Sequence, residues 1–287
     1  MKTGLVIIHY NDLESITNLI NNVSDYSVID KIVIVDNNSK EDIKKSLRKL
    51  SSKKIKLIEN KENKGFAAAI NIGCKYLNSE LGKCNLIISN SDIIIDKESD
   101  LEELINYLDK DKVGVVAPTV LENNKLNRGW KNPSPLIDSL MNIIYIHRFV
   151  RKKFVFYKED YYKDKVSKVT VVSGCFFLIR SDTLEKIDWF DENTFLYYEE
   201  NILAKKIHDN DLDVLVINDI IIIHNHSVSI DKNINKIKKL KLQKQSQYYF
   251  QVKYNKANFI EKFLLKSTAF INRNILKIVY FIKDLKR

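Results

Sequence analysis

Four side chains in this 287-residue sequence have the chemistry of a metal and acid–base site. Asp92 follows the apolar run CNLIISN, and its carboxylate is the hard oxygen ligand that Mg²⁺ or Mn²⁺ prefers. His224 closes a later apolar run and can be a further metal ligand or can contact the diphosphate, with His226 as a competitor. Glu199 and Glu200 are adjacent, and a partly buried Glu with a raised pKa can act as a general base. Each of these residues also has an ordinary structural interpretation, as a turn former, a helix start or a structural histidine.

A second group of residues suits a nucleotide. Asp36 ends the run KIVIVD, where a carboxylate can accept a hydrogen bond from a base or a ribose hydroxyl, or can simply cap the next helix. Lys64 and Gly65 open an Ala-rich segment. Glycine permits close approach of the backbone, and a helix start favours an anion. An ordinary tight turn would explain the same pair.

Alternating apolar and helical patterns must position these residues. Apolar runs predict strands at 3–8, 31–36, 54–60, 84–90, 113–118, 168–180, 213–217 and 219–224. Helical spacing or caps predict helices after most of them, including one at 199–210. This alternation favours a mostly parallel sheet with helices on both faces, in which ligands bind beyond the carboxyl ends of the strands. The polar residues listed above follow those ends.

The chain is expected to divide into a catalytic domain at 1–230 and a helical extension at 231–287. Within the first, 1–118 would bind the nucleotide and 119–230 the acceptor. The regular pattern loosens between 120 and 165, which we interpret as a mobile or acceptor-facing insertion.

The formal net charge of +10 favours an anionic partner, although a Lys-rich surface can also serve solubility alone. No aromatic–basic RNA motif is present, which argues against nucleic acid. Residues 257–287 alternate apolar and basic side chains and predict one or two basic amphipathic helices. Such helices can lie on an anionic membrane surface, or pack on the catalytic domain or on a second subunit of an oligomer.

The remaining composition indicates an intracellular protein. Cys74, Cys84 and Cys175 have neither disulfide-like nor metal-type spacing, which fits a reducing cytosol. The apolar run near the N-terminus is too short for a signal peptide. We therefore expect a cytoplasmic location, with the inner face of the cell membrane as an additional site if the basic helices bind lipid.

Seven segments, read in order over roughly 4–230, resemble the family-2 glycosyltransferases and look most like the rhamnosyltransferase-like branch that builds bacterial surface polysaccharides. The segments are VIIHYN, IVIVDNNS, ENKENKGFAAAINIG, LIISNSD, VSGCFFLIR, FDENTFLYYEENIL and IIHNHSVS. The resemblance implies an α/β fold of the GT-A type for nucleotide-diphospho-sugar transferases, with a mostly parallel Rossmann-like sheet.

The resemblance also implies roles for individual residues. Those implied for binding the nucleotide-sugar are His9, Tyr10, Asn11, Asp36, Asn38, Asn63, Lys64, Gly65, Asn71, Asn90, Ser91 and Gly174. Asp92 and His224 would hold the Mg²⁺ or Mn²⁺, and Glu200 would be the general base.

The acidic motif departs from the family pattern. The family often has Glu-Asp-x-Asp-Leu, whereas this chain has Glu-Glu-Asn-Ile-Leu at 199–203. The longer side chain of Glu200 moves its carboxylate by roughly one C–C bond, ~1.5 Å, and misplacement on that scale can be costly. Both Glu199 and Glu200 therefore stay candidates for the base, with Glu200 preferred.

Together these features predict an inverting glycosyltransferase that moves a sugar from a UDP- or dTDP-sugar to a saccharide or lipid-linked saccharide. A non-catalytic nucleotide- or polysaccharide-binding protein, a decayed transferase, is an alternative because of the altered acidic motif. A nucleotidyltransferase is disfavoured because VIIHYNDLES has neither the Gly nor the Lys of a phosphate loop.

Overall fold

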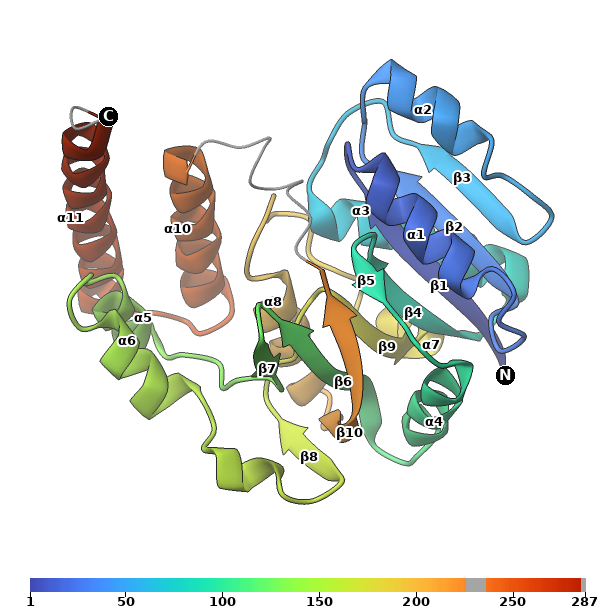
Figure 1. The fold of residues 1–287 in the computed structure, drawn as a ribbon. Coiled ribbons are helices and arrows are strands. Elements are labelled where there is room, and N and C mark those ends of the chain that lie inside the picture. The colour runs from blue at the N-terminus through green and yellow to red at the C-terminus, as the bar shows by residue number, and fades with distance from the viewer. Residues whose placement is uncertain (226–235, 285–287) are drawn as a thin grey trace.

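The computed structural model of the chain describes residues 1–225 and 236–284, and a ten-stranded mixed sheet forms its centre (Figure 1). The strands are β1 (Lys2–His9), β2 (Lys31–Asp36), β3 (Ile55–Glu59), β4 (Cys84–Asn90), β5 (Ile93–Ile94), β6 (Val113–Glu122), β7 (Lys125–Asn127), β8 (Val166–Val169), β9 (Phe176–Arg180) and β10 (Asp213–His224). Their order is β3-β2-β1-β4-β9-β6-β10-β5, with β7 beside β6 and β8 beside β10.

The larger pairings of the sheet are mostly parallel, as the sequence predicts. β1 pairs in parallel with β2 and β4, β2 with β3, and β6 with β10. β9 runs antiparallel between β4 and β6. The carboxyl ends of β1, β2 and β4 therefore meet at one edge, which is where ligands bind in sheets of this kind.

Two strand predictions are wrong in detail. The run at 168–180 is not one strand, because β8 pairs with β10 while β9 pairs with β4 and β6, and a turn separates them. The two strands expected at 213–217 and 219–224 form the single strand β10, with a register shift between Ile217 and Ile221. Asn218 lies within this shift, where its backbone N–H donates to Lys165 O and its side chain donates to Asp164 O.

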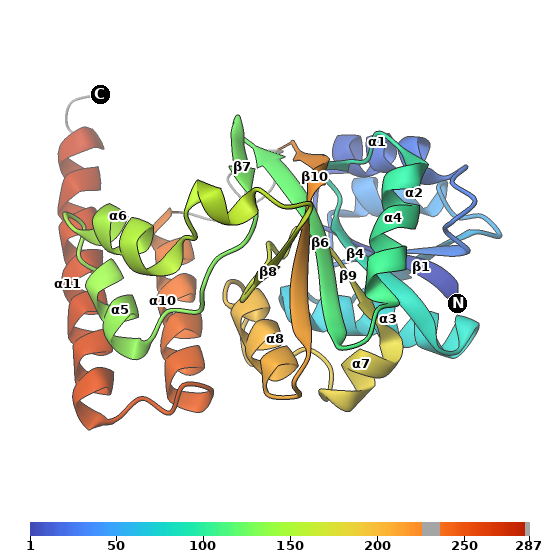
Figure 2. The ribbon, with the colours of Figure 1, turned by 90° about the horizontal axis from the view of Figure 1, so that it is seen from below.

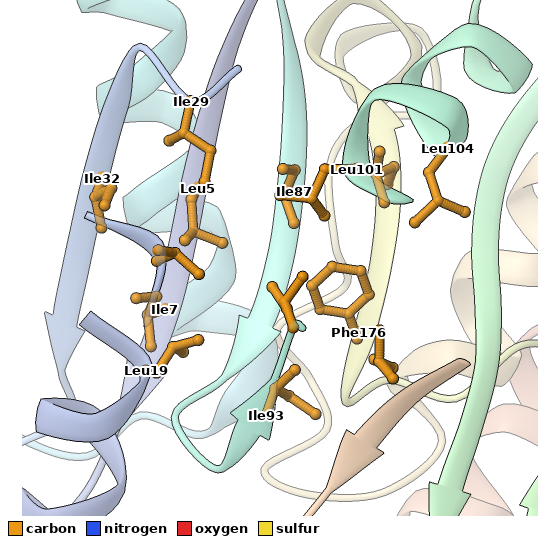
Figure 3. Close-up of a cluster of buried hydrophobic side chains, with 14 of the residues drawn as sticks. Leu5, Ile7, Leu19, Ile29, Ile32, Ile87, Ile93, Leu101, Leu104 and Phe176 are labelled. Carbon is orange, nitrogen blue, oxygen red and sulfur yellow. The ribbon is translucent and has the colours of Figure 1, made fainter. Parts of the chain in front are cut away.

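Helices cover both faces of the sheet because successive strand residues point to opposite faces (Figure 2). The helices of the sheet are α1 (Leu13–Val23), α2 (Glu41–Arg48), α3 (Phe66–Leu81), α4 (Glu98–Leu108), α7 (Ser181–Lys186) and α8 (Glu199–His208). On one face Leu5 and Ile7 of β1 pack with Leu19 of α1 and Leu101 of α4 (Figure 3). On the other face the alternate residues of β1 pack with α3, α7 and α8. Complete burial of one such Leu or Ile contributes about 1.5–3 kcal/mol.

A separate group of helices stands beside the sheet (Figure 1). It consists of α5 (Pro135–Met141), α6 (His147–Val150), α10 (Lys236–Lys253) and α11 (Phe259–Asp284). The main contacts are between α5 and α11 and between α10 and α11. The insertion expected at 120–165 is thus largely ordered, and its helix α5 packs with the expected C-terminal extension.

The insertion continues from α6 through a π-helical turn, η1 (Arg151–Val155), and a 3-10 turn, η2 (Glu159–Tyr162). α11 is one amphipathic helix of 26 residues and not a pair. Among the described helices, none is both long enough and apolar enough to cross a membrane.

Candidate functional site

Asp92 and His224 meet at the edge of the sheet because β5 pairs with the end of β10. Ile93 lies opposite His224 in that ladder, so the preceding Asp92 reaches the imidazole. Asp92 Oδ1 and His224 Nε2 are 3.2 Å apart, and both side chains are nearly buried. Burial by itself would lower the pKa of His224, but hydrogen bonds with Asp92 and Cys175 outweigh it and raise this pKa to about 10.

This pair can hold a divalent cation if substrate phosphates supply further ligands. The part of the chain that the structure describes contains no group of three or more His, Cys, Asp or Glu side chains arranged to hold a metal. Mg²⁺ is commonly bound through one or two carboxylates together with substrate phosphates, so one carboxylate and one imidazole fit that mode. Glu122, which the sequence analysis missed, lies with Oε1 3.8 Å from His224 Nδ1 and can orient the ring.

The turn before β9 joins this pair to the acidic motif. Cys175 accepts a hydrogen bond at its backbone oxygen from Asn90 N, 2.8 Å away, and its thiol hydrogen-bonds with His224. A Cβ added to Gly174 would lie 3.9 Å from Glu200 Oε2. One short turn therefore hydrogen-bonds with His224 on one side and passes beside Glu200 on the other, where Gly174 has no side chain to fill the space.

Glu199 and Glu200 begin α8 after a tight turn in which Tyr197 and Tyr198 have φ values of 74° and 73°. Glu199 is 5 % exposed, and its Oε1 has no hydrogen-bond partner among the described residues. Glu200 is half-buried and lines a cavity of about 480 Å³. Burial raises the pKa of both carboxyls, and the charge of Glu200 raises that of Glu199 further. The geometry favours Glu200 as the base, because its carboxyl reaches the cavity.

Helix α10 holds the turn that carries Glu200. Tyr198 Oη lies within hydrogen-bonding distance of both carboxylate oxygens of Asp138 on α5, and Gln251 of α10 donates to the same carboxylate. Asp138 is completely buried, which raises its pKa to about 6 although Gln251 and Tyr198 donate hydrogen bonds to it. Ser246 of α10 donates to Leu196 O at 2.9 Å.

A second carboxylate fixes the start of the same loop. Asp191 Oδ2 accepts hydrogen bonds from Tyr249 at 2.8 Å, Lys253 at 2.9 Å and Tyr254 at 2.6 Å. Burial would raise the pKa of Asp191, but hydrogen bonds from Tyr254, Lys253 and Asn193 outweigh burial and lower this pKa. We call residues 191–198, which lead into the Glu199–Glu200 pair, the acidic loop. Helix α10 holds it near both ends, a link that no sequence pattern predicts.

His9 and Asp36 support the nucleotide edge from inside the protein. Both side chains are fully buried, with His9 Nδ1 3.0 Å from Asp36 Oδ1 and Ser39 N donating to Asp36 Oδ2. Burial would raise the pKa of Asp36, but hydrogen bonds from His9 and Ser39 outweigh it and lower it. Their direct contact with the nucleoside stays a prediction, and within the protein these hydrogen bonds fix both side chains. The bond from Ser39 N also fixes the loop that follows β2.

The loop before α3 reaches the acidic loop through Gly65. Asn63 Oδ1 accepts hydrogen bonds from Asn37 Nδ2 and Gly65 N. Gly65 has φ of 99°, and a Cβ there would lie 2.4 Å from Phe195 O. Only glycine tolerates both conditions. Lys64 is exposed beside Glu62, with their charged groups 3.3 Å apart.

Asn71 links α3 to the segment that begins at Phe190, and its predicted place near the ribose and diphosphate stays a prediction. Its amide donates to Phe190 O and to Glu192 Oε1, and its oxygen accepts from Phe190 N. The side chain is almost completely buried, and two of these three bonds use both of its N–H donors. It fixes the start of the acidic loop.

The other predicted residues lie at the carboxyl edge, where they were expected. Tyr10 and Asn11 follow β1 and are half-exposed. Asn38 is exposed, and its Oδ1 accepts a hydrogen bond from Lys44. Asn90 ends β4 half-exposed and Ser91 is buried. His226 lies outside the described residues.

The mostly parallel sheet with helices on both faces, together with the matches that follow, gives the chain a GT-A fold. The chain belongs to glycosyl transferase family 2, whose family model matches residues 5–188. It is similar to the low-salt glycan biosynthesis hexosyltransferase Agl10 of Haloferax volcanii, with 24 % identity over 197 residues. The match covers 69 % of this chain and 58 % of that relative, so the chain spans well under two thirds of the relative's length.

Solved structures share the fold at low sequence identity. GalNAc-T7 with UDP, GalNAc and Mn²⁺ has a TM-score of 0.60 at 16 % identity, over 78 % of this chain and 44 % of that one. The mannosyltransferase PcManGT of Pyrobaculum calidifontis with GDP-Man and Mn²⁺ has a TM-score of 0.58 at 14 % identity, over 94 % and 69 %. TarS of S. aureus has a TM-score of 0.56 at 16 % identity, over 93 % and 43 %.

Proposed function

We propose that this protein is a metal-dependent, inverting glycosyltransferase that moves a sugar from a nucleoside diphosphate to an acceptor hydroxyl. The observation that carries the proposal is the turn at 173–175, which hydrogen-bonds with His224 through Cys175 and passes beside Glu200 at Gly174. A leaving-group site and a base beside one another are what a single displacement at the anomeric carbon needs.

In this mechanism Glu200 accepts the proton of the acceptor hydroxyl as the oxygen attacks the anomeric carbon. The bond to the diphosphate breaks on the opposite side, toward Asp92 and His224. Mg²⁺ or Mn²⁺ bound there would neutralise the charge of the departing diphosphate. The shared fold with structures holding UDP or GDP-Man supports a nucleoside-diphosphate donor. We infer UDP- or dTDP-sugar as the donor, in a rhamnosyltransferase-like role in surface polysaccharide synthesis.

The acidic pair provides the sharpest test. Glu200→Gln should lower kcat by about 1,000-fold or more while leaving the dissociation constant of the donor nearly unchanged, since a general base acts only in the transition state. Glu199→Gln is the matched variant and should retain measurable turnover. If Glu200→Gln turns over at the normal rate, Glu200 is not the base.

A second test separates an enzyme from a decayed binding protein. A thermal-shift panel of nucleotides and nucleotide-sugars, with and without Mn²⁺, should show metal-dependent stabilisation that Asp92→Ala removes. Nucleotide binding without hydrolysis or transfer of any donor would favour the non-catalytic alternative. Formation of a nucleotide-sugar from a sugar phosphate would favour a nucleotidyltransferase.

We also propose that α11 contacts an anionic membrane surface, where a lipid-linked saccharide would be the acceptor. Phe259, Phe263 and Phe270 share one stripe of the helix and are 84 %, 63 % and 57 % exposed, whereas Leu265 on the opposite side is buried. Lys262 lies close to the exposed stripe at helical spacing. An exposed apolar stripe with a basic border is typical of helices that lie in a membrane interface. Such contact would place the protein at the inner face of the cell membrane.

Vesicle co-sedimentation tests this contact without removing the helices that hold the acidic loop. The protein should pellet with vesicles containing anionic phosphatidylglycerol, and much less with neutral phosphatidylcholine. Phe263→Gln with Phe270→Gln should reduce pelleting several-fold. Ile221→Gln, an exposed apolar position on β10, is the control. Equal pelleting of both variants would remove the membrane proposal.

A further inference from the structure

A second, larger cavity lies beside the one that contains Glu200. Its volume is about 1010 Å³, and the β7 hairpin forms one wall while η1, η2 and the residues between them form the other. None of the residues assigned above to the nucleotide or to the base lines it.

The two cavities meet at Trp130 and Arg151. Both side chains line the large cavity and also the cavity of about 480 Å³ that Glu200 lines. The Arg151 guanidinium lies over the Phe156 ring, 4.6 Å from its centroid. A ligand that reacts beside Glu200 can therefore extend past Trp130 into the large cavity.

The position of Trp130 is fixed by the backbone on both sides. Trp130 and Val171 exchange two hydrogen bonds of 2.9 Å, and the next residue donates to Val155 O. The preceding Gly129 has φ of 100°, and a Cβ there would lie 2.5 Å from Val171 O. This glycine permits the close approach of the two strands that presents Trp130 between the cavities.

The walls combine aromatic rings with an excess of positive charge. Trp130, Phe156, Tyr157 and Tyr162 supply the rings. The cations are Lys125, Arg128, Arg151, Lys152 and Lys158, and the anions are Glu122 and Glu159. Arg128 and Glu159 form an ion pair of 2.9 Å, and the Arg128 guanidinium lies 5.2 Å from the centroid of the Tyr162 ring.

Most of this positive charge is available to a ligand. Within the described residues, Lys125, Lys152 and Lys158 form no ion pair with a carboxylate. A cavity lined with charge of one sign concentrates the opposite sign, and arginine binds carboxylate and phosphate groups in a fixed geometry. Aromatic rings have an apolar face that suits the apolar face of a sugar ring.

We propose that this second cavity binds the part of the acceptor beyond the reacting sugar, and that this part is an acidic oligosaccharide. The proposal rests on the proposed function, because it takes Glu200 to mark the reacting end. It gives the insertion at 120–165 a defined role: the insertion selects a charged saccharide chain, several rings long, over a single sugar.

Direct binding tests this site without any donor. Two α-1,4-linked hexasaccharides serve as probes, the acidic hexagalacturonate and the neutral maltohexaose, titrated calorimetrically at low salt. Hexagalacturonate should bind at least about 10-fold more tightly, since two or three charge contacts easily supply the ~1.4 kcal/mol of a tenfold difference. Equal affinities, or no binding of hexagalacturonate, would overturn the proposal.

Variants localise the binding. Lys125→Glu with Lys152→Glu should weaken hexagalacturonate by about 10-fold and leave maltohexaose unchanged, whereas Trp130→Ala should weaken both. Lys186→Glu, exposed on α7 away from the cavity, is the matched control and should behave like the unaltered protein. Unchanged hexagalacturonate affinity in the double Lys variant would place the saccharide elsewhere and overturn the site.

The thermal-shift panel of nucleotides and nucleotide-sugars distinguishes failure of this proposal from failure of the proposed function. If hexagalacturonate binds as described while no nucleotide-sugar is bound or turned over, the second cavity stands and the transferase proposal fails. If donor binding and hydrolysis occur but the hexasaccharide does not bind, the transferase proposal stands and the second cavity fails.

Discussion

Tyr198 Oη lies 2.9 and 3.0 Å from the two carboxylate oxygens of Asp138, sixty positions away in the chain. Tyr198 immediately precedes the acidic pair and has a left-handed backbone, which costs free energy for any residue other than glycine. Gln251 of α10 donates to the same carboxylate. The insertion and the C-terminal helices therefore hold the turn that aims Glu200.

Tyr198→Phe should lower kcat about 10-fold with little change in the KM of the donor, because the turn carrying Glu200 loosens while the nucleotide edge is untouched. Loss of a buried hydrogen bond to a carboxyl should also lower the free energy of unfolding by about 1.5–3 kcal/mol. Steady-state kinetics and denaturant unfolding measure the two effects. Tyr107→Phe on α4 is the control. A change in KM alone would show that Tyr198 does not position the base.

Gly65→Ala and Gly82→Ala form a matched pair, because the two glycines bound the same helix α3 and both have positive φ. At Gly82, no atom of the described residues lies within 4 Å of an added Cβ, so only backbone strain of about 1 kcal/mol is expected. At Gly65 the Cβ would meet Phe195 O at 2.4 Å. Gly65→Ala should therefore cost at least about 1 kcal/mol more, and it alone should lower kcat. Equal losses of stability and activity would show that the contact with Phe195 is unimportant.

Asp138 should make the protein less stable as the pH rises from about 4 to about 6. Its pKa is raised by burial to about 6 in the folded protein, so the folded state holds this proton more tightly than the unfolded state. The stabilisation is complete below the unfolded pKa and is lost as pH rises through the folded one, an effect of about 3 kcal/mol. Denaturant unfolding at pH 4 and 6.5 should show a smaller fall for Asp138→Asn. Asp42→Asn, exposed on α2, should keep the original slope.

The acid limb of the kcat/KM profile should lie above the range of an ordinary glutamate. The base must be deprotonated to act, and burial raises the pKa of Glu200, so activity falls as the pH decreases through that raised pKa. The charge of Glu200 raises the pKa of Glu199, so Glu199 is still neutral while Glu200 titrates. Glu199→Gln replaces it with another neutral group and should leave the limb in place. A limb that moves to lower pH in Glu199→Gln would show that Glu199 is already charged while Glu200 titrates.

The edge of the sheet could be predicted from the sequence because it depends on local patterns. Asp92 and His224 each follow an apolar run, and parallel strands bring such ends together. Asn71 and Asp36 show the limit of this reasoning. Their types and positions suit a ligand. In the structure, however, Asn71 is hydrogen-bonded to Phe190 and Asp36 to His9, and both side chains are buried. Such burial depends on how distant segments pack, which the sequence pattern does not show.

The support of the acidic loop could not be predicted for a related reason. Asp138 lies in a segment with weak periodicity, and Gln251 is one of several similar residues in a Lys- and Gln-rich stretch. No spacing relates two residues that are 113 positions apart. Only the hydrogen bond between Gln251 and Asp138 in the folded protein identifies them as the support of the acidic loop.

The link between α5 and α10 also has a consequence for biosynthesis. A ribosome makes β1 to β4 and their covering helices first, and such early segments can fold while later ones are still being added. Asp138 is synthesised 113 residues before its partner Gln251. A growing chain can thus complete its nucleotide edge before its acidic turn is locked, and so acquire the capacity to hold a donor before it can consume one.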